Sequence, residues 1–267
     1  MKLPTEIEHT TGGGLVAPPC SLLSGDSWRL ELGDSLEAMK QMKDGAFHAV
    51  VTDPPYMIGA ISTGDAKSKA GSWVDLMNAA FWYRHWMGEC WRILKDGGYF
   101  VVFTNWRTVP MLMKACADAK IATSSLAVWD KEWIGPAGPA QLRPTYEMML
   151  FCGKGSAKIP NRSQSDIFRE KWMAGNMAQS GHPAQKPVPL LRKVIELITE
   201  PGQSVFDPFT GSGTTGIAAL QIGRTFHGFE GDDAHFTTAG DRLRNAGEPL
   251  NELFTENADC PVSGEAD

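Results

Sequence analysis

The chain alternates short apolar runs with longer amphipathic segments. The short runs predict strands, and segments with apolar residues every three or four positions predict helices between them. We expect strands at Trp28–Leu32, His48–Thr52, Tyr99–Phe103, Thr123–Trp129, Tyr146–Phe151, Ser204–Asp207 and Thr225–Phe229. We expect helices at Ser35–Met42, Trp73–Leu94, Val109–Ala119, Val188–Thr199, Gly213–Ile222 and Asp232–Arg244. This alternation predicts an α/β fold, with a doubly wound, mostly parallel sheet covered by helices on both faces.

The remaining segments divide the 267 residues into a main domain and two ends. Residues 1–24 are expected to be a flexible N-terminal segment and residues 25–244 the main domain. Residues 245–267 carry six acids and no Lys or Arg, which is typical of a solvated acidic tail. Residues 57–72 are rich in Gly, Ser, Lys and Ala and predict a loop.

Cysteine, histidine and apolar content exclude several classes of protein. The five cysteines are an odd number and form no Cys-x-x-Cys pair, so neither a zinc site nor a disulfide framework is expected. That usage is typical of the cytoplasm. No His has metal-ligand spacing, and no apolar run reaches the ~20 residues of a membrane helix. We therefore expect a cytoplasmic protein without a resident metal.

Charge is unevenly distributed along the chain. The net charge is −6, but the segment from Arg143 to Lys193 carries nine basic and three acidic residues, a net charge of +6. A basic segment in an acidic protein indicates a docking surface for a polyanion. Within it, residues 152–187 are polar and hard to assign to helix or strand, which indicates an inserted recognition region.

Acids end four of the expected strands. They are Asp34, Asp53, Asp207 and Glu230. A single acid after a strand is often only a helix N-cap. Four acids at the carboxyl ends of parallel strands would meet in one crevice, which is where ligands bind in such sheets.

The turn after the strand at 204–207 carries the pattern Gly-x-Gly-x-x-Gly from Gly211 to Gly216. This pattern alone favours a nicotinamide enzyme of permuted order as one reading. The carboxylate of Asp207 at the same turn would repel a pyrophosphate. A cofactor with a ribose, an adenine and a cationic end, such as S-adenosylmethionine, suits these acids better.

The sharpest signal is Asp53-Pro54-Pro55-Tyr56, which follows the buried strand at 48–52. Two prolines stiffen the turn and remove amide donors, so it presents the Asp53 carboxylate and the Pro54 carbonyl as acceptors. Two adjacent acceptors suit an amino group, and Tyr56 offers a face to a planar ring. The turn predicts chemistry on the exocyclic amine of a nucleobase.

Together these motifs resemble those of the DNA amino-methyltransferases. The Asp-Pro-Pro-Tyr motif precedes the segment Phe206–Thr215, an order that is similar to the beta class, which contains adenine-N6 and cytosine-N4 enzymes. His182-Pro183-Ala184-Gln185-Lys186-Pro187 resembles a further element of that class, with Ala184 where Thr is usual. The resemblance implies a Rossmann-like methyltransferase domain with permuted motif order over residues 25–244.

The resemblance also implies roles for individual residues. Asp53, Pro54, Pro55 and Tyr56 would form the catalytic turn that holds a flipped base. The implied S-adenosylmethionine site comprises Asp34, Lys186, Asp207, Pro208, Phe209, Gly211, Ser212, Gly213, Thr214 and Glu230. Candidate DNA contacts are Lys67, Lys69, Lys154, Lys158, Arg162, Arg169 and Lys171.

The expected function is transfer of a methyl group from S-adenosylmethionine to adenine N6 in double-stranded DNA. The alternatives are cytosine-N4 methylation, the permuted nicotinamide oxidoreductase, and a non-catalytic DNA-binding descendant. Because the recognition region is short, we expect a short or degenerate recognition sequence. A stripe of Phe81, Trp82 and Trp86 on the long helix is a candidate homodimer face.

Overall fold

A computed structural model describes residues 21–55, 73–172 except 136, 138, 140 and 141, and 185–247. For residues 73–79 and 247 it describes the backbone only. Several expectations lie outside the described residues. They are the roles of Tyr56, Lys67 and Lys69, the structure of residues 1–20 and 248–267, and the element at 182–184.

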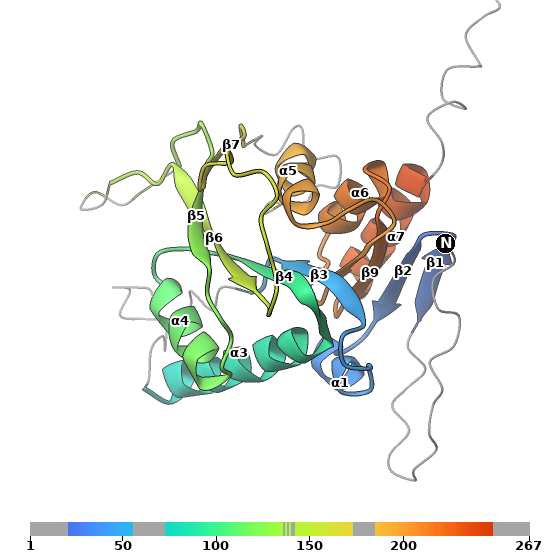
Figure 1. Cartoon of the computed structure of the whole chain (residues 1–267), viewed down its shortest axis with the longest axis horizontal. Helices are drawn as coiled ribbons and strands as arrows, with labels where there is room; N and C mark the ends of the chain where they lie inside the picture. Colours follow the sequence, from blue (N-terminus) through green and yellow to red (C-terminus); the bar gives the residue numbers. More distant parts are fainter. Residues whose placement is uncertain are drawn as a thin grey trace, which may run out of the picture.

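The described residues form one nine-stranded sheet with the order β1-β2-β9-β8-β3-β4-β6-β5-β7 (Figure 1). The strands are β1 (Leu22–Gly25), β2 (Trp28–Leu32), β3 (Phe47–Thr52), β4 (Leu94–Thr104), β5 (Ser125–Asp130), β6 (Tyr146–Gly153), β7 (Ile167–Arg169), β8 (Ser204–Asp207) and β9 (Thr225–Glu230). The run β2-β9-β8-β3-β4 is parallel, whereas β1 and β6 are antiparallel to their neighbours. The expected α/β class and mostly parallel sheet are confirmed.

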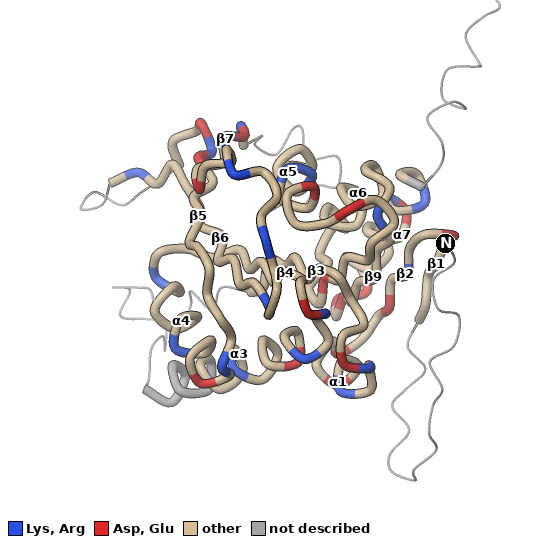
Figure 2. The backbone as a smooth tube through the Cα atoms, in the orientation of Figure 1, with Lys and Arg blue, Asp and Glu red and all other residues tan. Residues whose placement is uncertain are grey.

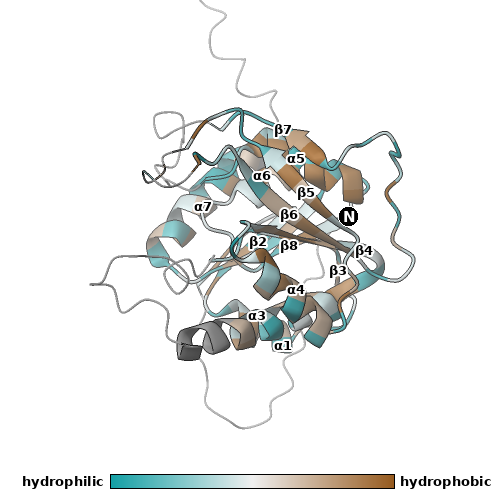
Figure 3. Cartoon of the chain, turned by 90° about the vertical axis from the view of Figure 1, so that its left-hand side faces the viewer, coloured by the Kyte–Doolittle hydropathy of each residue, from teal (hydrophilic) through white to brown (hydrophobic). Residues whose placement is uncertain are grey.

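Helices cover both faces of the sheet. They are α1 (Ser35–Lys40), α3 (Trp73–Ile93), α4 (Val109–Asp118), α5 (Val188–Ile198), α6 (Thr214–Gln221) and α7 (Asp233–Gly247). Helices α1, α3 and α4 lie on one face and α5, α6 and α7 on the other (Figure 1). The strands between the two layers are predominantly apolar, as Figure 3 shows. None of the helices in the described part of the chain is long and apolar enough to span a membrane.

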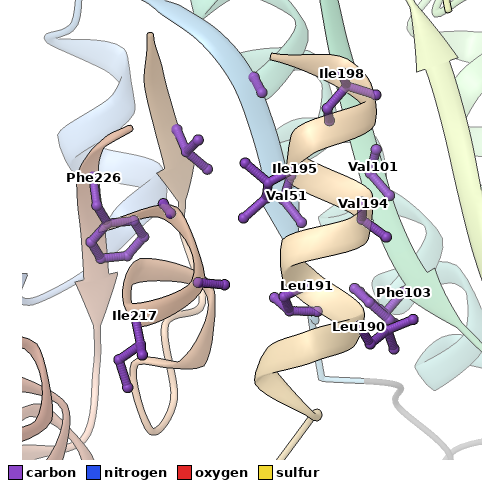
Figure 4. Packing of buried hydrophobic residues seen from close by; sticks show 14 of the residues in the cluster. Val51, Val101, Phe103, Leu190, Leu191, Val194, Ile195, Ile198, Ile217 and Phe226 are labelled. Carbon is purple, nitrogen blue, oxygen red and sulfur yellow. The ribbon is translucent and has the colours of Figure 1, made fainter. Parts of the chain in front are cut away.

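Helix α5 shows how the apolar pattern produces this packing. Its buried residues recur at helical spacing and face side chains of β3 and β4 (Figure 4). They are Leu190, Leu191, Val194, Ile195 and Ile198 on the helix, and Val51, Val101 and Phe103 on the strands. Burying one such side chain stabilises the fold by roughly 1.5–3 kcal/mol. This packing holds the segment before α5 against the end of β3.

Two strands were missing from the expected set. Strand β1 pairs antiparallel with β2 through a two-residue turn, with Gly25 opposite Trp28, so the sheet begins within the expected 1–24 segment. Strand β7 lies inside the region 152–187, parallel to β5. With four and three residues, both strands are too short for an alternation of apolar and polar residues to be recognised in the sequence.

The expected aromatic stripe on α3 does not form one exposed face. Trp86 is fully buried and packs edge-on against Phe100, whereas Phe81 is 64% exposed. Trp86 belongs to the core and so cannot be part of the predicted homodimer face, whereas a face at Phe81 and Trp82 stays a prediction. Cys90, Cys116 and Cys152 are buried and unbridged, as small apolar residues are.

Candidate active site

The Asp-Pro-Pro turn and the glycine-rich turn lie side by side. Strands β3 and β8 pair in parallel, with Val50 opposite Phe206, so Asp53 and Asp207 end neighbouring strands. The Thr52 hydroxyl donates a hydrogen bond of 2.7 Å to Asp207 Oδ1. Both turns line one cleft of about 520 Å³. The two motifs, far apart in sequence, therefore share a single site.

The glycine-rich turn is held in shape by the acids at the strand ends. Gly211 and Gly213 have φ values of 54° and 85°, in the left-handed region that favours glycine. Asp207 Oδ1 accepts the amide of Phe209 at 3.0 Å, and Glu230 Oε2 accepts the amide of Gly211 at 2.7 Å. Phe209, Gly211, Ser212, Thr214 and Glu230 line the cleft, while Pro208 and Gly213 shape the turn behind it.

Asp207 is a buried acid with an altered protonation equilibrium. Burial raises the pKa of Asp207 to about 6, although hydrogen bonds from Thr52, Thr215 and the Phe209 amide act to lower it. The nearby charge of Asp53 raises it further. A cation bound beside Asp207 would favour its ionised form.

The two oxygens of Asp53 have different surroundings. Oδ2 accepts a hydrogen bond from Lys186 Nζ at 2.5 Å. Oδ1 is buried and, among the residues that the structure describes, has no hydrogen-bond partner. The Tyr83 hydroxyl of α3 donates to the Pro55 carbonyl at 2.7 Å and anchors the turn. An unpartnered buried carboxylate oxygen is costly, and a donor on a bound molecule would satisfy it.

Four aromatic side chains from the β4, β5 and β7 side of the sheet also line the cleft. Trp133 and Trp172, which follow β5 and β7, lie with ring centroids 4.4 Å apart. Phe103 and Trp129 are the other two, and Lys131 and Glu147 line the cleft as well. Sequence reasoning missed Trp133, Trp172 and Glu147 as site residues. The sequence hinted at two of them only by position. Trp133 follows the carboxyl end of the expected strand at 123–129, and Glu147 lies at the start of the expected strand at 146–151.

Two predicted cofactor ligands make contacts other than the expected ones. Asp34 caps α1 by accepting the amides of Leu36 at 2.8 Å and Glu37 at 3.3 Å, and it does not line the cleft. Its strand, β2, lies outside β9, one strand further from the centre. Lys186, expected in the cofactor site, lines the cleft but pairs with Asp53.

The predicted DNA contacts separate into two groups. Lys154 donates to the carbonyls of Trp91 and Leu94, both at 2.6 Å, and so binds the carboxyl end of α3. Its charge is thus used within the fold, and its role as a DNA contact stays a prediction. Lys158, Arg162, Arg169 and Lys171 are exposed. Basic residues mark the connection from β6 to β7 in Figure 2.

Comparison with known proteins identifies the family. The model of a DNA methylase family, of the N6 and N4 amino-methyltransferases, matches residues 47–240. The chain belongs to this family. The "Putative methylase YubD" of Escherichia coli (strain K12) is 32% identical over 74% of this chain and 82% of its own length. The DNA adenine methyltransferase YhdJ of the same organism is 25% identical over 74% of this chain and 76% of its own length.

A solved relative shares the fold of this DNA amino-methyltransferase. The M1.HpyAVI–SAM complex superposes with a TM-score of 0.61 at 24% identity, covering 81% of this chain and all of the other. The family match spans β3, with the Asp-Pro-Pro turn, and β8, with the glycine-rich turn. The cleft between these turns is thus the candidate active site of a DNA amino-methyltransferase.

Proposed function

We propose that this DNA amino-methyltransferase transfers a methyl group from S-adenosylmethionine to N6 of an adenine flipped out of double-stranded DNA. The observation that carries the proposal is the buried Asp53 Oδ1, which lacks a partner among the described residues and belongs to a residue that lines the same cleft as the glycine-rich turn. An exocyclic amine brings the N–H donor that this oxygen needs.

The residues of the cleft fit S-adenosylmethionine. Asp207 is a buried acid placed to meet an ammonium group, and the glycine-rich turn opens α6 beside it. A Cβ on Gly213 would lie 3.2 Å from that of Ala239, so this turn packs closely against α7. Three acids line the cleft, namely Asp53, Asp207 and Glu230. They would repel the pyrophosphate of a nicotinamide cofactor, which weighs against the oxidoreductase.

The bound cofactor supplies a sulfonium methyl group as the electrophile. The task of the protein is to make a base amine nucleophilic, because the amine lone pair is delocalised into the ring. Asp53 Oδ1 and the Pro54 carbonyl accept its two hydrogens and favour a tetrahedral nitrogen whose lone pair is free. As the nitrogen–carbon bond formed and the sulfur–carbon bond broke, the cofactor would leave as a neutral thioether. The proton released from the amine would pass to solvent or to Asp53. Tyr56 is proposed to stack on the base.

Adenine is the favoured target because the turn begins with Asp. In the family that this chain resembles, Asp before Pro-Pro-Tyr accompanies adenine more often than cytosine. The relative YhdJ, which carries the adenine activity in its name, supports the same choice. The exposed basic residues of the 152–187 region are proposed to contact phosphates near the cleft.

Nucleoside analysis tests this proposal. The protein is incubated with unmethylated duplex DNA and tritiated methyl donor, and the products are identified by mass spectrometry. N6-methyladenine is expected, and it should disappear in Asp53→Ala while that variant still binds S-adenosylmethionine. N4-methylcytosine without N6-methyladenine would replace the adenine assignment with the cytosine one. Tight NAD binding without S-adenosylmethionine binding would favour the oxidoreductase.

A further inference from the structure

We propose that Glu147 and Lys186 are positioning residues that hold the Asp53 carboxylate in the orientation that keeps Oδ1 as the acceptor for the target amine. The inference rests on the proposed function and assigns Lys186 to the base side of the site. It gives Glu147, on β6, a role in positioning Asp53 that acts through Lys186.

The geometry is a chain of four charged side chains that alternate in sign. Lys131 Nζ lies 2.5 Å from Glu147 Oε1, and Lys186 Nζ lies 3.2 Å from Glu147 Oε2. Lys186 Nζ then lies 2.5 Å from Asp53 Oδ2. The four residues come from segments that are distant in sequence, and all of them line the cleft.

Because these four side chains are mostly buried, their ion pairs fix the position of each group more firmly than surface ion pairs would. Only 9% of the Lys186 side chain is exposed, and its Nζ lies 5.4 Å from the centroid of the Phe103 ring. Burial alone would lower the pKa of Lys186, but the carboxylates of Asp53 and Glu147 raise it above its ordinary value. The pKa of Glu147 is lowered, because Lys186 and Lys131 outweigh the effect of its own burial. Lys186 and Glu147 therefore both stay charged.

The ammonium group of Lys186 is held between Asp53 and Glu147, which fixes its position. The fixed ammonium group in turn orients the Asp53 carboxylate. Rotating the carboxylate would lose the Lys186 bond and leave a buried charge uncompensated, which is strongly destabilising. Oδ2 is thus committed to Lys186, and Oδ1 is the oxygen presented to the amine. The two lysines and two acids of this row of side chains carry no net charge together, so the row does not repel a cationic cofactor.

The test compares variants of Lys186 and Glu147 in the full-length protein. Lys186→Met should lower kcat at saturating cofactor and DNA by about 10²-fold, the effect of a misplaced acceptor, while the Kd for S-adenosylmethionine stays within twofold. Lys186→Arg should restore part of that loss. Glu147→Gln should cost about tenfold, the value of one charge-assisted hydrogen bond. Asp118→Asn neutralises an acid paired with Lys114 on α4, outside the cleft, and should not change kcat.

The double variant separates positioning from a merely structural role. If Glu147 acts through Lys186, adding Glu147→Gln to Lys186→Met should cost nothing further in kcat. Independent, multiplying losses would overturn the proposal. So would a Lys186→Met enzyme with normal kcat and weakened cofactor binding, which would place Lys186 in the cofactor site. A wild-type protein that methylates no base would instead refute the proposed function itself.

Discussion

The hydroxyl of Thr52 donates a hydrogen bond of 2.7 Å to Asp207, joining the strand that ends in the Asp-Pro-Pro turn to the strand that ends at the glycine-rich turn. Thr52 and Asp207 are 1% and 2% exposed. The bond is thus shielded from water, and it lowers the pKa of Asp207 against the larger effect of burial. The protonation of Asp207 is therefore linked to both halves of the cleft.

Cofactor affinity should depend on pH through Asp207. Its pKa of about 6 means that the carboxyl gains a proton as the pH falls through that value and can no longer attract an ammonium group. We expect the Kd for S-adenosylmethionine to be constant above about pH 7 and to rise about tenfold per pH unit well below the pKa. Calorimetric titration of the protein with S-adenosylmethionine, at pH values above and below 6, measures this Kd. Asp207→Asn should bind weakly at every pH, and a variant that kept the wild-type pH dependence would assign it to another group.

The same acid should make the ligand-free protein less stable as the pH rises. The folded-state pKa lies above the ordinary value of 3.8 for an aspartic acid, so the folded protein binds a proton that the unfolded chain has released. The stabilisation is complete below about pH 4 and is lost as the pH rises through about 6. Asp207→Asn should therefore raise the unfolding free energy at pH 8 by up to about 3 kcal/mol and change it little at pH 4. Denaturant unfolding at both pH values tests this, and an equal change at both would contradict it.

Removing the Thr52 hydroxyl should raise the pKa of Asp207. Thr52→Val keeps the shape of the side chain but deletes the donor, at a cost of about 1 kcal/mol in stability. The pH midpoint of cofactor binding should move upward, because one of the bonds that favour the ionised form is gone. Thr52→Ser retains the hydroxyl and should leave the midpoint where it is. An unchanged midpoint in Thr52→Val would mean that the bond does not influence Asp207.

Trp133 is expected to contribute to capture of the target base. Its ring lies against that of Trp172, and both rings line the cleft that Asp53 lines, so they offer a planar base an apolar wall. Since base–aromatic stacking is worth about 1–3 kcal/mol, Trp133→Ala should raise the KM for DNA by roughly five- to a hundredfold, with an unchanged Kd for S-adenosylmethionine. Trp106→Ala removes a tryptophan that is 59% exposed outside the cleft, and its KM should match wild type. Equal effects of both variants would rule out a specific role for Trp133.

The elements and the meeting of the two motifs could be predicted because they depend on local patterns. Acids that end parallel strands come together once the strands are neighbours, and the sheet order places β9, β8 and β3 side by side. Asp34 shows the limit of this reasoning, since an acid after a strand serves equally well as a helix cap. The contact between Glu147 and Lys186 could not be foreseen. It depends on the antiparallel pairing of β6 with β4 and on where the chain before α5 meets that pair.

The distribution of charge along the sequence could not distinguish basic side chains that face solvent from those that form hydrogen bonds within the protein. The two kinds should differ in their effect on DNA binding. Arg162 is exposed between β6 and β7, whereas Lys154 in the same basic segment donates to carbonyls at the end of α3. Arg162→Ala should weaken DNA binding and reduce the slope of log Kd against log salt by about 0.9, because one phosphate contact is lost. Lys154→Met should leave this slope unchanged but lower the unfolding free energy by about 1–3 kcal/mol. Fluorescence anisotropy at several salt concentrations, beside thermal unfolding, measures both. If Lys154→Met reduced the salt slope as Arg162→Ala does, Lys154 would have to leave α3 when DNA binds.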